Sequence, residues 1–203
     1  MNKLYLLPFL LFFSLATFAQ DTIVHVNGGI FIVNLIEQDS QKVFYKLYDQ
    51  PESRIFHLEK SSIFSISKGD GEQEVLYRYD PNIGNIYQVD EMRLFIKGEQ
   101  DAGSRYRSRI SNIASIIGGA AGGVVLGQGG ILGLTAPLVT SALLSIPNPK
   151  IRPKTVRDMR YYSLQAYQHG YLREAKKKRY LKSLLLSSIS LGISTAITAL
   201  LID

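Results

Sequence analysis

The chain has 203 residues, a net charge of +6 and no cysteine. This length allows one small domain together with membrane segments. The absence of cysteine excludes disulfides, thiolate catalysis, Cys-ligated zinc and an acylated lipoprotein cysteine. Between Lys150 and Lys182, eleven Lys and Arg residues stand against two acidic residues, so this segment carries +9 and the rest of the chain −3. Such a confined positive charge favours an anionic lipid surface over an acidic soluble substrate.

Residues 1–19 have the pattern of a secretory signal peptide. A short basic start precedes the apolar run from Leu4 to Phe18, and small residues stand before a cleavage position at Gln20. The run has the length of a signal core and is short for a membrane span, which needs about 20 residues. An uncleaved N-terminal anchor is the alternative.

Residues 20–79 alternate between short apolar runs and turn residues. Asn27-Gly28-Gly29 is a hairpin signal, because Asn and Gly accept positive φ angles. The predicted strands are 22–26, 30–37, 42–48, 54–58, 63–67 and 74–79. This pattern predicts a small SH3-like or Sm-like antiparallel β-domain.

Several stretches resemble a family of exported membrane proteins of the Bacteroidetes whose function is unknown. They are the opening DTIVHVNGG, KVFYK and LEKSSIFSI, and later MRLFIKGEQDA, the Gly-rich run and Tyr167-x-x-Gly170-Tyr171-x-x-x-Ala175. The resemblance implies a signal peptide, a small β-domain and membrane helices. It implies no activity.

Residues 80–109 are predicted as a linker followed by an amphipathic helix, 89–109. Met92, Phe95 and Ile96 lie at helical spacing. The carboxylates of Glu99 and Asp101 are expected on the solvated face. Three arginines near the end of the helix stand before the next apolar run, where cationic side chains reach lipid headgroups: Arg105, Arg107 and Arg109.

Residues 110–146 form a Gly-rich hydrophobic segment without a charged residue. As one helix it would extend about 55 Å, against a hydrocarbon core of about 30 Å. It is either a helical hairpin that turns at Gln128–Gly130 or one tilted span kinked near Pro137. Length and the Gly-rich break favour the hairpin. The basic segment that follows favours one net crossing, since such flanks tend to stay in the cytoplasm, and we expect one net crossing of the inner membrane.

Five glycines of this segment stand at helix-packing positions. Gly119, Gly123 and Gly127 are four residues apart, and Gly118 and Gly122 form a parallel pair beside them. Glycines at this spacing let helices approach closely, which is the main attraction available in lipid. The partner is either the C-terminal apolar helix of the same chain or a second copy. A homo-oligomer could also form a pore.

The C-terminal part combines a basic, Tyr-rich interfacial helical segment, 147–180, with a transmembrane helix, 181–203. The run Lys176, Lys177, Lys178 and Arg179 is a candidate for binding lipid headgroups, or a flank that only sets topology. A nucleic-acid partner is not expected beside a membrane segment of an exported chain.

No residue pattern indicates catalysis, a cofactor or a metal. The three histidines lie far apart in the sequence, at 25, 57 and 169, and no Ser has a nucleophile motif. We therefore expect an α+β protein: a β-domain followed by amphipathic and transmembrane helices. The expected function is a non-catalytic, membrane-anchored envelope protein in the inner membrane, with an exported N-terminal interaction domain. The alternative is a small oligomeric pore or transporter component.

Overall fold

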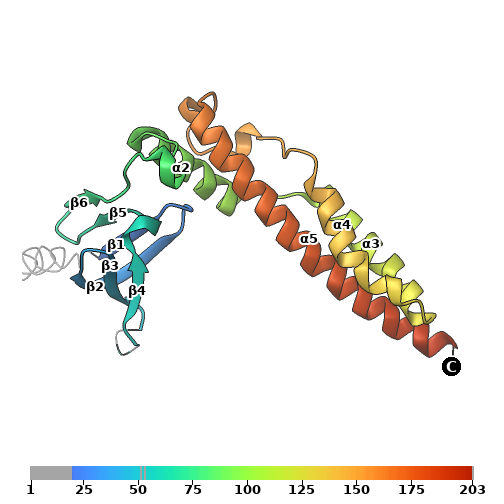
Figure 1. Ribbon diagram of the computed structural model, residues 1–203. Helices are drawn as coiled ribbons and strands as arrows, with labels where there is room; N and C mark the ends of the chain where they lie inside the picture. The colour runs from blue at the N-terminus through green and yellow to red at the C-terminus, as the bar shows by residue number, and fades with distance from the viewer. Residues whose placement is uncertain (1–19, 51, 53, 203) are drawn as a thin grey trace, which may run out of the picture. The chain divides into compact units, whose positions relative to one another are not determined.

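The computed structural model describes residues 20–50, 52 and 54–202, and the fold is α+β, as predicted (Figure 1). The chain divides after Val89 into two compact units. We call them the β-domain and the helical unit. The predicted signal peptide, residues 1–19, lies outside the described residues.

The β-domain contains a six-stranded antiparallel sheet. Its strands are β1 (Asp21–His25), β2 (Ile30–Gln38), β3 (Lys42–Leu47), β4 (Phe56–Glu59), β5 (Ile63–Ser67) and β6 (Gln73–Val75), in the order β4-β3-β2-β1-β5-β6. A short 3₁₀ helix, η1 (Lys60–Ser62), joins β4 to β5. The β1–β2 hairpin turns at Gly28, whose φ of 78° explains why glycine stands there.

One face of this sheet forms the core of the β-domain. Five fully buried aliphatic side chains lie at its centre: Ile23, Val33, Val43, Ile63 and Ile66. The Asp21 carboxylate connects neighbouring segments, because it accepts hydrogen bonds from the N–H groups of Leu35 at 3.1 Å and Gly69 at 2.9 Å. Strand alternation therefore buries one apolar face, as the sequence pattern predicted.

The last strand is shorter than predicted. The sequence indicated 74–79, but β6 ends at Val75. The N–H groups of Leu76 and Tyr77 both donate to the same carbonyl, that of Phe64, so regular strand pairing stops there. The side chain of Tyr77 is buried, and its hydroxyl donates to the Tyr87 carbonyl at 2.9 Å.

The described part of the helical unit has four α-helices: α2 (Val89–Arg105), α3 (Arg109–Gly127), α4 (Ala136–Ser145) and α5 (Gln165–Ile202). Two boundaries differ from the prediction. The first helix ends at Arg105, so only Arg105 of the three expected arginines lies on it, and Arg109 begins α3. The predicted boundary between 180 and 181 is not observed, because one helix of 38 residues runs from Gln165 to Ile202, and the residues before it form a loop with two short 3₁₀ helices, η4 (Pro153–Thr155) and η5 (Met159–Tyr161).

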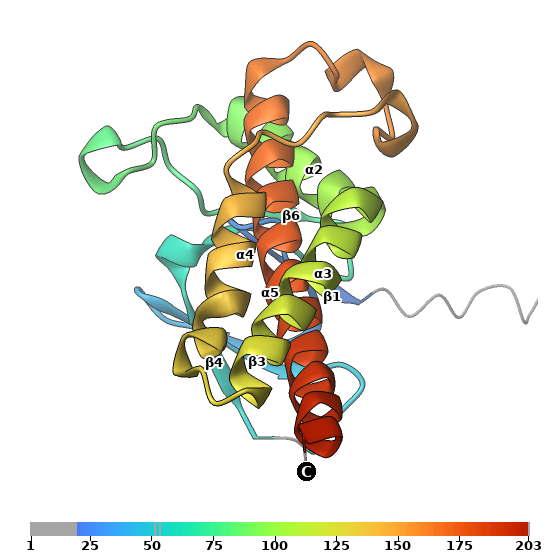
Figure 2. The same cartoon turned by 90° about the vertical axis from the view of Figure 1, so that its right-hand side faces the viewer.

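Residues 110–146 form the hairpin. After α3, Gln128–Gly130 reverse the chain with Gly129 at a φ of 87°, and the 3₁₀ helix η3 (Ile131–Thr135) continues into α4. Figures 1 and 2 show α3, α4 and the C-terminal part of α5 side by side. We call these three helices the bundle. The single tilted span is not observed, and the chain returns to the end of the bundle where α3 began.

Two of the described helices, α3 and α5, are long and apolar enough to cross a membrane by length and composition. The end of the bundle near Arg109, Ser145 and Lys182 is called its base below.

Candidate functional site: the bundle and its base

The packing of α3 against α5 depends on three glycines. A Cβ atom on Gly119 would overlap the backbone of Ser187, and one on Gly127 would lie 2.6 Å from the Cβ of Thr198. Between them, a Cβ on Gly123 would lie 2.7 Å from the Cβ of Ser194. Real Cβ contacts are longer than this, so the two helices approach closely because these positions carry no side chain.

The other two predicted glycines face α4. A Cβ on Gly118 would lie 2.8 Å from Cγ2 of Thr140, and one on Gly122 would lie 2.9 Å from the Gly133 carbonyl oxygen. The five glycines therefore divide between two neighbouring helices of the same chain. Both sets of glycines therefore already contact helices of the same molecule.

Hydroxyl groups complete the α3–α5 interface. The hydroxyls of Ser115 and Ser183 are 2.7 Å apart and both side chains are buried. Further along, Ser190 donates to the Ile116 carbonyl at 2.7 Å and Ser194 to the Ala120 carbonyl at 2.9 Å. The buried Ser115–Ser183 pair gives each hydroxyl a partner away from water, as burial requires.

Polarity in the bundle is the reverse of that in the β-domain. Its buried polar side chains are serines: Ser111, Ser115, Ser141, Ser183 and Ser187. Its exposed side chains are mostly large and apolar, including Ile113, Ile117, Leu138, Leu143, Leu185, Ile189, Ile193 and Leu200.

A second glycine contact joins α2 to the start of α5. A Cβ on Gly98 would lie 2.8 Å from the Tyr171 nitrogen, and one on Gly170 would lie 2.8 Å from the carbonyl carbon of Phe95. Each helix thus presents a glycine to the backbone of the other. Tyr167 and Tyr171, both fully buried, lie beside this crossing.

Asp101 lies at the centre of a polar cluster next to the crossing. Its carboxylate is 4% exposed and accepts hydrogen bonds from the Tyr167 hydroxyl at 2.7 Å and the Arg157 N–H at 2.9 Å. Arg157 also forms an ion pair with it at 3.7 Å. Nearby, the Tyr171 hydroxyl donates to Thr155 at 2.6 Å. These bonds fix the loop 147–164 against both helices.

Glu99 is the other buried carboxylate of α2, at 3% exposure. One oxygen is 3.6 Å from Nε of Arg173, and the second oxygen has no hydrogen-bond partner among the described residues. Burial raises the pKa of Glu99 to about 7, while Arg173 opposes that rise and Glu174 adds to it. The carboxyl group is therefore poised to bind a proton near neutral pH.

The prediction that Glu99 and Asp101 lie on a solvated helix face is wrong. Glu99 stands four residues after Phe95 and three before Ala102, and both of these neighbours are buried. Helical spacing alone therefore placed Glu99 on the buried face. Nothing in the sequence indicated the partners of Asp101, because Arg157 and Tyr167 are more than fifty residues away.

The basic run Lys176–Arg179 is divided among several partners. Lys177 pairs with Glu174 at 3.2 Å. Lys178 donates to the Gly103 carbonyl near the end of α2, and Arg179 donates to the Pro147 carbonyl just beyond α4. Cations at these places complement the partial negative charge of helix C-termini. These two side chains thus connect three helices, a role that sequence spacing did not reveal.

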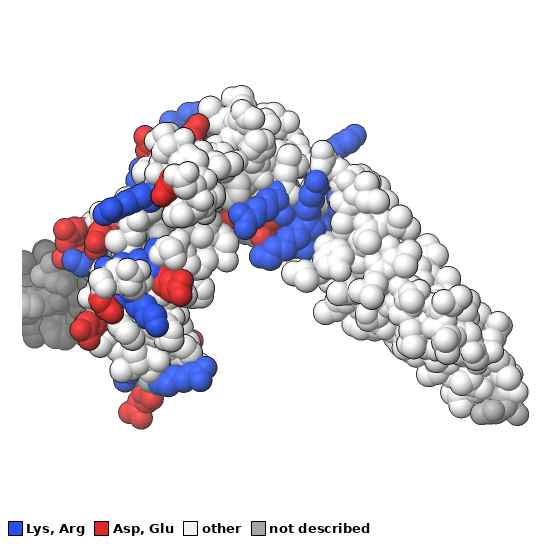
Figure 3. Space-filling view, in the orientation of Figure 1, with Lys and Arg blue, Asp and Glu red and all other residues white. Residues whose placement is uncertain are grey.

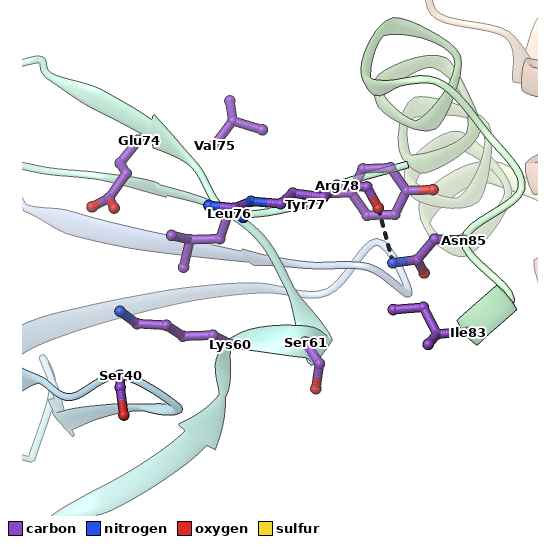
Figure 4. Close-up of a pocket in the computed structure, with 10 residues that line it drawn as sticks. All are labelled: Ser40, Lys60, Ser61, Glu74, Val75, Leu76, Tyr77, Arg78, Ile83 and Asn85. Atoms are coloured by element: carbon purple, nitrogen blue, oxygen red, sulfur yellow. Dashed lines mark hydrogen bonds between the residues drawn. The ribbon is translucent and has the colours of Figure 1, made fainter. Parts of the chain in front are cut away.

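The β-domain has a groove of about 440 Å³, lined by η1, β6 and the segment that follows β6 (Figure 4). Lys60, Glu74 and Arg78 are its charged residues, and the Asn85 amide donates to the Arg78 carbonyl at 3.0 Å. Such a mixed lining suits a peptide or another polar partner.

Across residues 20–50, 52 and 54–202, no three His, Asp or Glu side chains are grouped so as to hold a metal ion. Comparisons of the chain with protein-family models, curated proteins and solved structures found no match. Any functional assignment therefore depends on the geometry described above.

Proposed function

We propose that this protein is a non-catalytic, membrane-anchored protein of the cell envelope, with the bundle embedded in a bilayer and the β-domain acting as an interaction module. The observation that carries this proposal is the reversed polarity of the bundle. Water-soluble helices bury Leu and Ile and expose Ser. This bundle does the opposite over most of its surface.

The alternative explanation for apolar helices is the core of a soluble protein, where they would be covered. In the most apolar stretch of 18 residues, only 6% of the residues of α5 and 28% of those of α3 are buried inside the structure. An apolar surface of this extent is unfavourable in water and favourable in hydrocarbon. The Gly and Ser contacts inside the bundle supply the van der Waals packing and hydrogen bonds that hold helices together in lipid.

The dimensions of the bundle also match a bilayer. The 19 residues of α3 correspond to about 28 Å, close to the hydrocarbon thickness of about 30 Å. No charged residue occurs between Arg109 and Lys150 or between Lys182 and Asp203. Figure 3 shows Lys and Arg side chains at the base of the bundle and an uncharged surface beyond them.

The hairpin constrains topology. In an embedded bundle the hairpin would return the chain to the side it entered from. We therefore propose that the β-domain and the base lie on the same side of the membrane, instead of the single net crossing that the charge distribution favours. We place the bundle in the inner membrane, with the β-domain and the base outside the cytoplasm, because residues 1–19 have the pattern of a signal peptide. The positive charge of the base argues against this placement, because Lys- and Arg-rich flanks tend to stay in the cytoplasm. Two cations of the basic segment, Arg157 and Arg173, pair with buried carboxylates, which reduces its effective positive charge.

For the β-domain we propose an SH3-like fold and a binding role. Support comes from the pairing of β1 with β5, the 3₁₀ helix between β4 and β5, and the irregularity in β2 between Leu35 and Glu37. On β2, Ile30, Ile32 and Ile36 are about half exposed, which provides an apolar surface for a partner. The resemblance to exported Bacteroidetes proteins agrees with this placement.

Single cysteines in a chain that has none test the anchor and its topology. We choose Gln128→Cys at the hairpin turn and Lys154→Cys in the loop at the base, both at exposed positions. The protein should stay in the membrane after carbonate extraction. A membrane-impermeant thiol reagent should label position 154 from the exported side and position 128 only after permeabilisation. Release by carbonate, or equal labelling of both positions in intact cells, would contradict the embedded hairpin.

The second candidate, an oligomeric pore, has less support. Its proposed contact surface, the five glycines, already faces α4 and α5 of the same chain. Ion flux through liposomes that hold the purified protein measures it directly, and we expect flux no greater than that of protein-free liposomes.

A further inference from the structure

A small basic pocket lies at the base of the bundle, with a volume of about 280 Å³. Its lining comes from the last turn of α2, the α2–α3 connection, the start of α3 and one side of α5: Ser104, Tyr106, Arg107, Ser108, Asn112, Lys178, Arg179 and Lys182. Four of these side chains are cations and none is acidic. We call it the basic pocket.

Two of its cations have no counter-charge. Arg107 and Lys182 form no ion pair or side-chain hydrogen bond among the residues that the structure describes. Lys178 and Arg179 are held in place by the carbonyl groups of Gly103 and Pro147. Four like charges repel one another, so an anion between them would offset that repulsion.

Two side chains of the pocket offer donors that suit phosphate oxygens. Asn112 offers amide N–H groups, and Arg107 offers the paired N–H groups that bind two phosphate oxygens at once, whereas the hydroxyls of Ser104 and Ser108 already donate to the Gln100 carbonyl and the Ser111 hydroxyl. The pocket also borders the first turn of α3, a helix of 19 residues. The free N–H groups and positive end of that turn favour an anion.

We propose that the basic pocket binds the phosphate of an anionic phospholipid headgroup. Its position selects lipid over soluble phosphate. Arg107 lies two residues before α3, and Lys182 is the last charged residue before the apolar end of α5. In the embedded bundle this is the depth of the headgroups, where long cationic side chains meet lipid phosphates. The lipid assignment rests on the proposed membrane anchor, whereas the phosphate chemistry depends only on the pocket.

The test compares two double variants of the full-length protein in mild detergent. Arg107→Gln with Lys182→Gln removes two positive charges from the pocket. Lys150→Gln with Lys154→Gln removes the same charge from exposed positions outside it. Native mass spectrometry measures binding of phosphatidylglycerol, with phosphatidylcholine as the neutral lipid and inorganic phosphate as the soluble anion.

We expect phosphatidylglycerol to bind more tightly than phosphatidylcholine, and the pocket variant to lose about tenfold in affinity while the control variant loses about twofold or less. Equal losses in both variants, or no preference for the anionic lipid, would overturn the proposal. Inorganic phosphate that binds as tightly, with the same dependence on Arg107 and Lys182, would assign the pocket to a soluble anion instead.

Carbonate extraction of the same variants separates the two proposals. A protein that stays in the membrane but shows no pocket-dependent lipid binding refutes only the pocket. A protein that leaves the membrane refutes the anchor, and lipid as the ligand with it. Circular dichroism checks folding. If the double variant does not fold, Lys182→Gln alone, at an exposed side chain, should reduce affinity about threefold.

Discussion

The β-domain and the bundle bury opposite kinds of side chain. The sheet buries Ile and Val, whereas the bundle buries Gly and Ser and exposes Ile and Leu. In water, burying apolar surface is the main driving force, so the largest aliphatic side chains belong inside. In hydrocarbon that force is absent, and close backbone contact with hydrogen-bonded hydroxyls takes its place.

The crossing of α2 with the start of α5 shows a third pattern, between the other two. There α2 and α5 also meet through glycines, but the neighbouring side chains are tyrosines, carboxylates and arginines. Gly98 and Gly170 thus act as Gly119 does, while Asp101 and Glu99 bring charge into a buried site. Glycine contacts therefore allow close helix packing both at the polar α2–α5 crossing and in the apolar bundle.

The strongest challenge to the bundle is a large side chain at its closest contact. Gly119→Ile should destabilise the helical unit by at least about 3 kcal/mol, because even a Cβ overlaps the Ser187 backbone. Ala121→Ile, at an exposed position of the same helix, should change little. Thermal unfolding in detergent, followed by circular dichroism, measures both. Similar stability of the two variants would contradict the packing described here.

The corresponding test of the β-domain is a substitution that removes buried apolar volume from its core. Ile66→Ala should cost about 3 kcal/mol, since Ile66 is fully buried in the core of the sheet. Ile189→Ala, at a side chain that is 53% exposed on α5, should leave unfolding in detergent unchanged within about 0.5 kcal/mol. If both substitutions cost the same, the contrast between the two regions fails.

Glu99 should make the stability of the helical unit depend on pH. Its pKa is about 7 in the folded protein, above the usual value near 4.5, so the folded state binds the proton more tightly. This stabilisation is complete below about pH 4.5 and is lost as the pH rises through 7, a change of about 2 kcal/mol between pH 5 and 8. Glu99→Gln should flatten that dependence. A pH profile unchanged by the substitution would show that Glu99 is not the group responsible.

Removal of the Asp101 carboxylate tests the polar cluster. Asp101→Ala should cost about 2 kcal/mol, because the buried Tyr167 hydroxyl and the Arg157 N–H lose their acceptor. Asp158→Ala removes an exposed ion pair with Arg160 and one hydrogen bond from the Arg160 backbone N–H, and it should cost less than about 1 kcal/mol. Chemical unfolding in detergent distinguishes them, and a larger cost for Asp158→Ala would contradict this account.

The smallest effect concerns a single hydroxyl pair in the bundle. Ser115→Ala leaves the buried Ser183 hydroxyl without this partner and should cost about 0.6 kcal/mol, the average for such bonds within membrane bundles. Ser188→Ala, at an exposed position beside the interface, is the control and should have no effect. A cost above about 2 kcal/mol would mean that hydrogen bonds, rather than glycine contacts, dominate this interface.

Local patterns in the sequence determined much of this protein. Alternation of apolar residues located the strands, and the charge-free stretches marked α3, α4 and the end of α5. The four-residue spacing of Gly119 and Gly123 put them on one helix face, because a helical period depends only on the chain itself. The turn at Gln128–Gly130 was recognisable too, because two adjacent glycines permit a reversal of the chain, and Gly129 indeed adopts a positive φ.

Contacts between distant segments were decided only by the tertiary structure. The burial of Asp101 depends on Tyr167, and the basic pocket brings Arg107 to Lys182, across more than sixty residues in each case. The capping of α2 and α4 by Lys178 and Arg179 likewise requires α5 to lie beside both. Spacing along one helix shows which residues share a face. Only the crossing of helices determines what that face meets, and therefore whether a charge is solvated, paired or poised for a ligand.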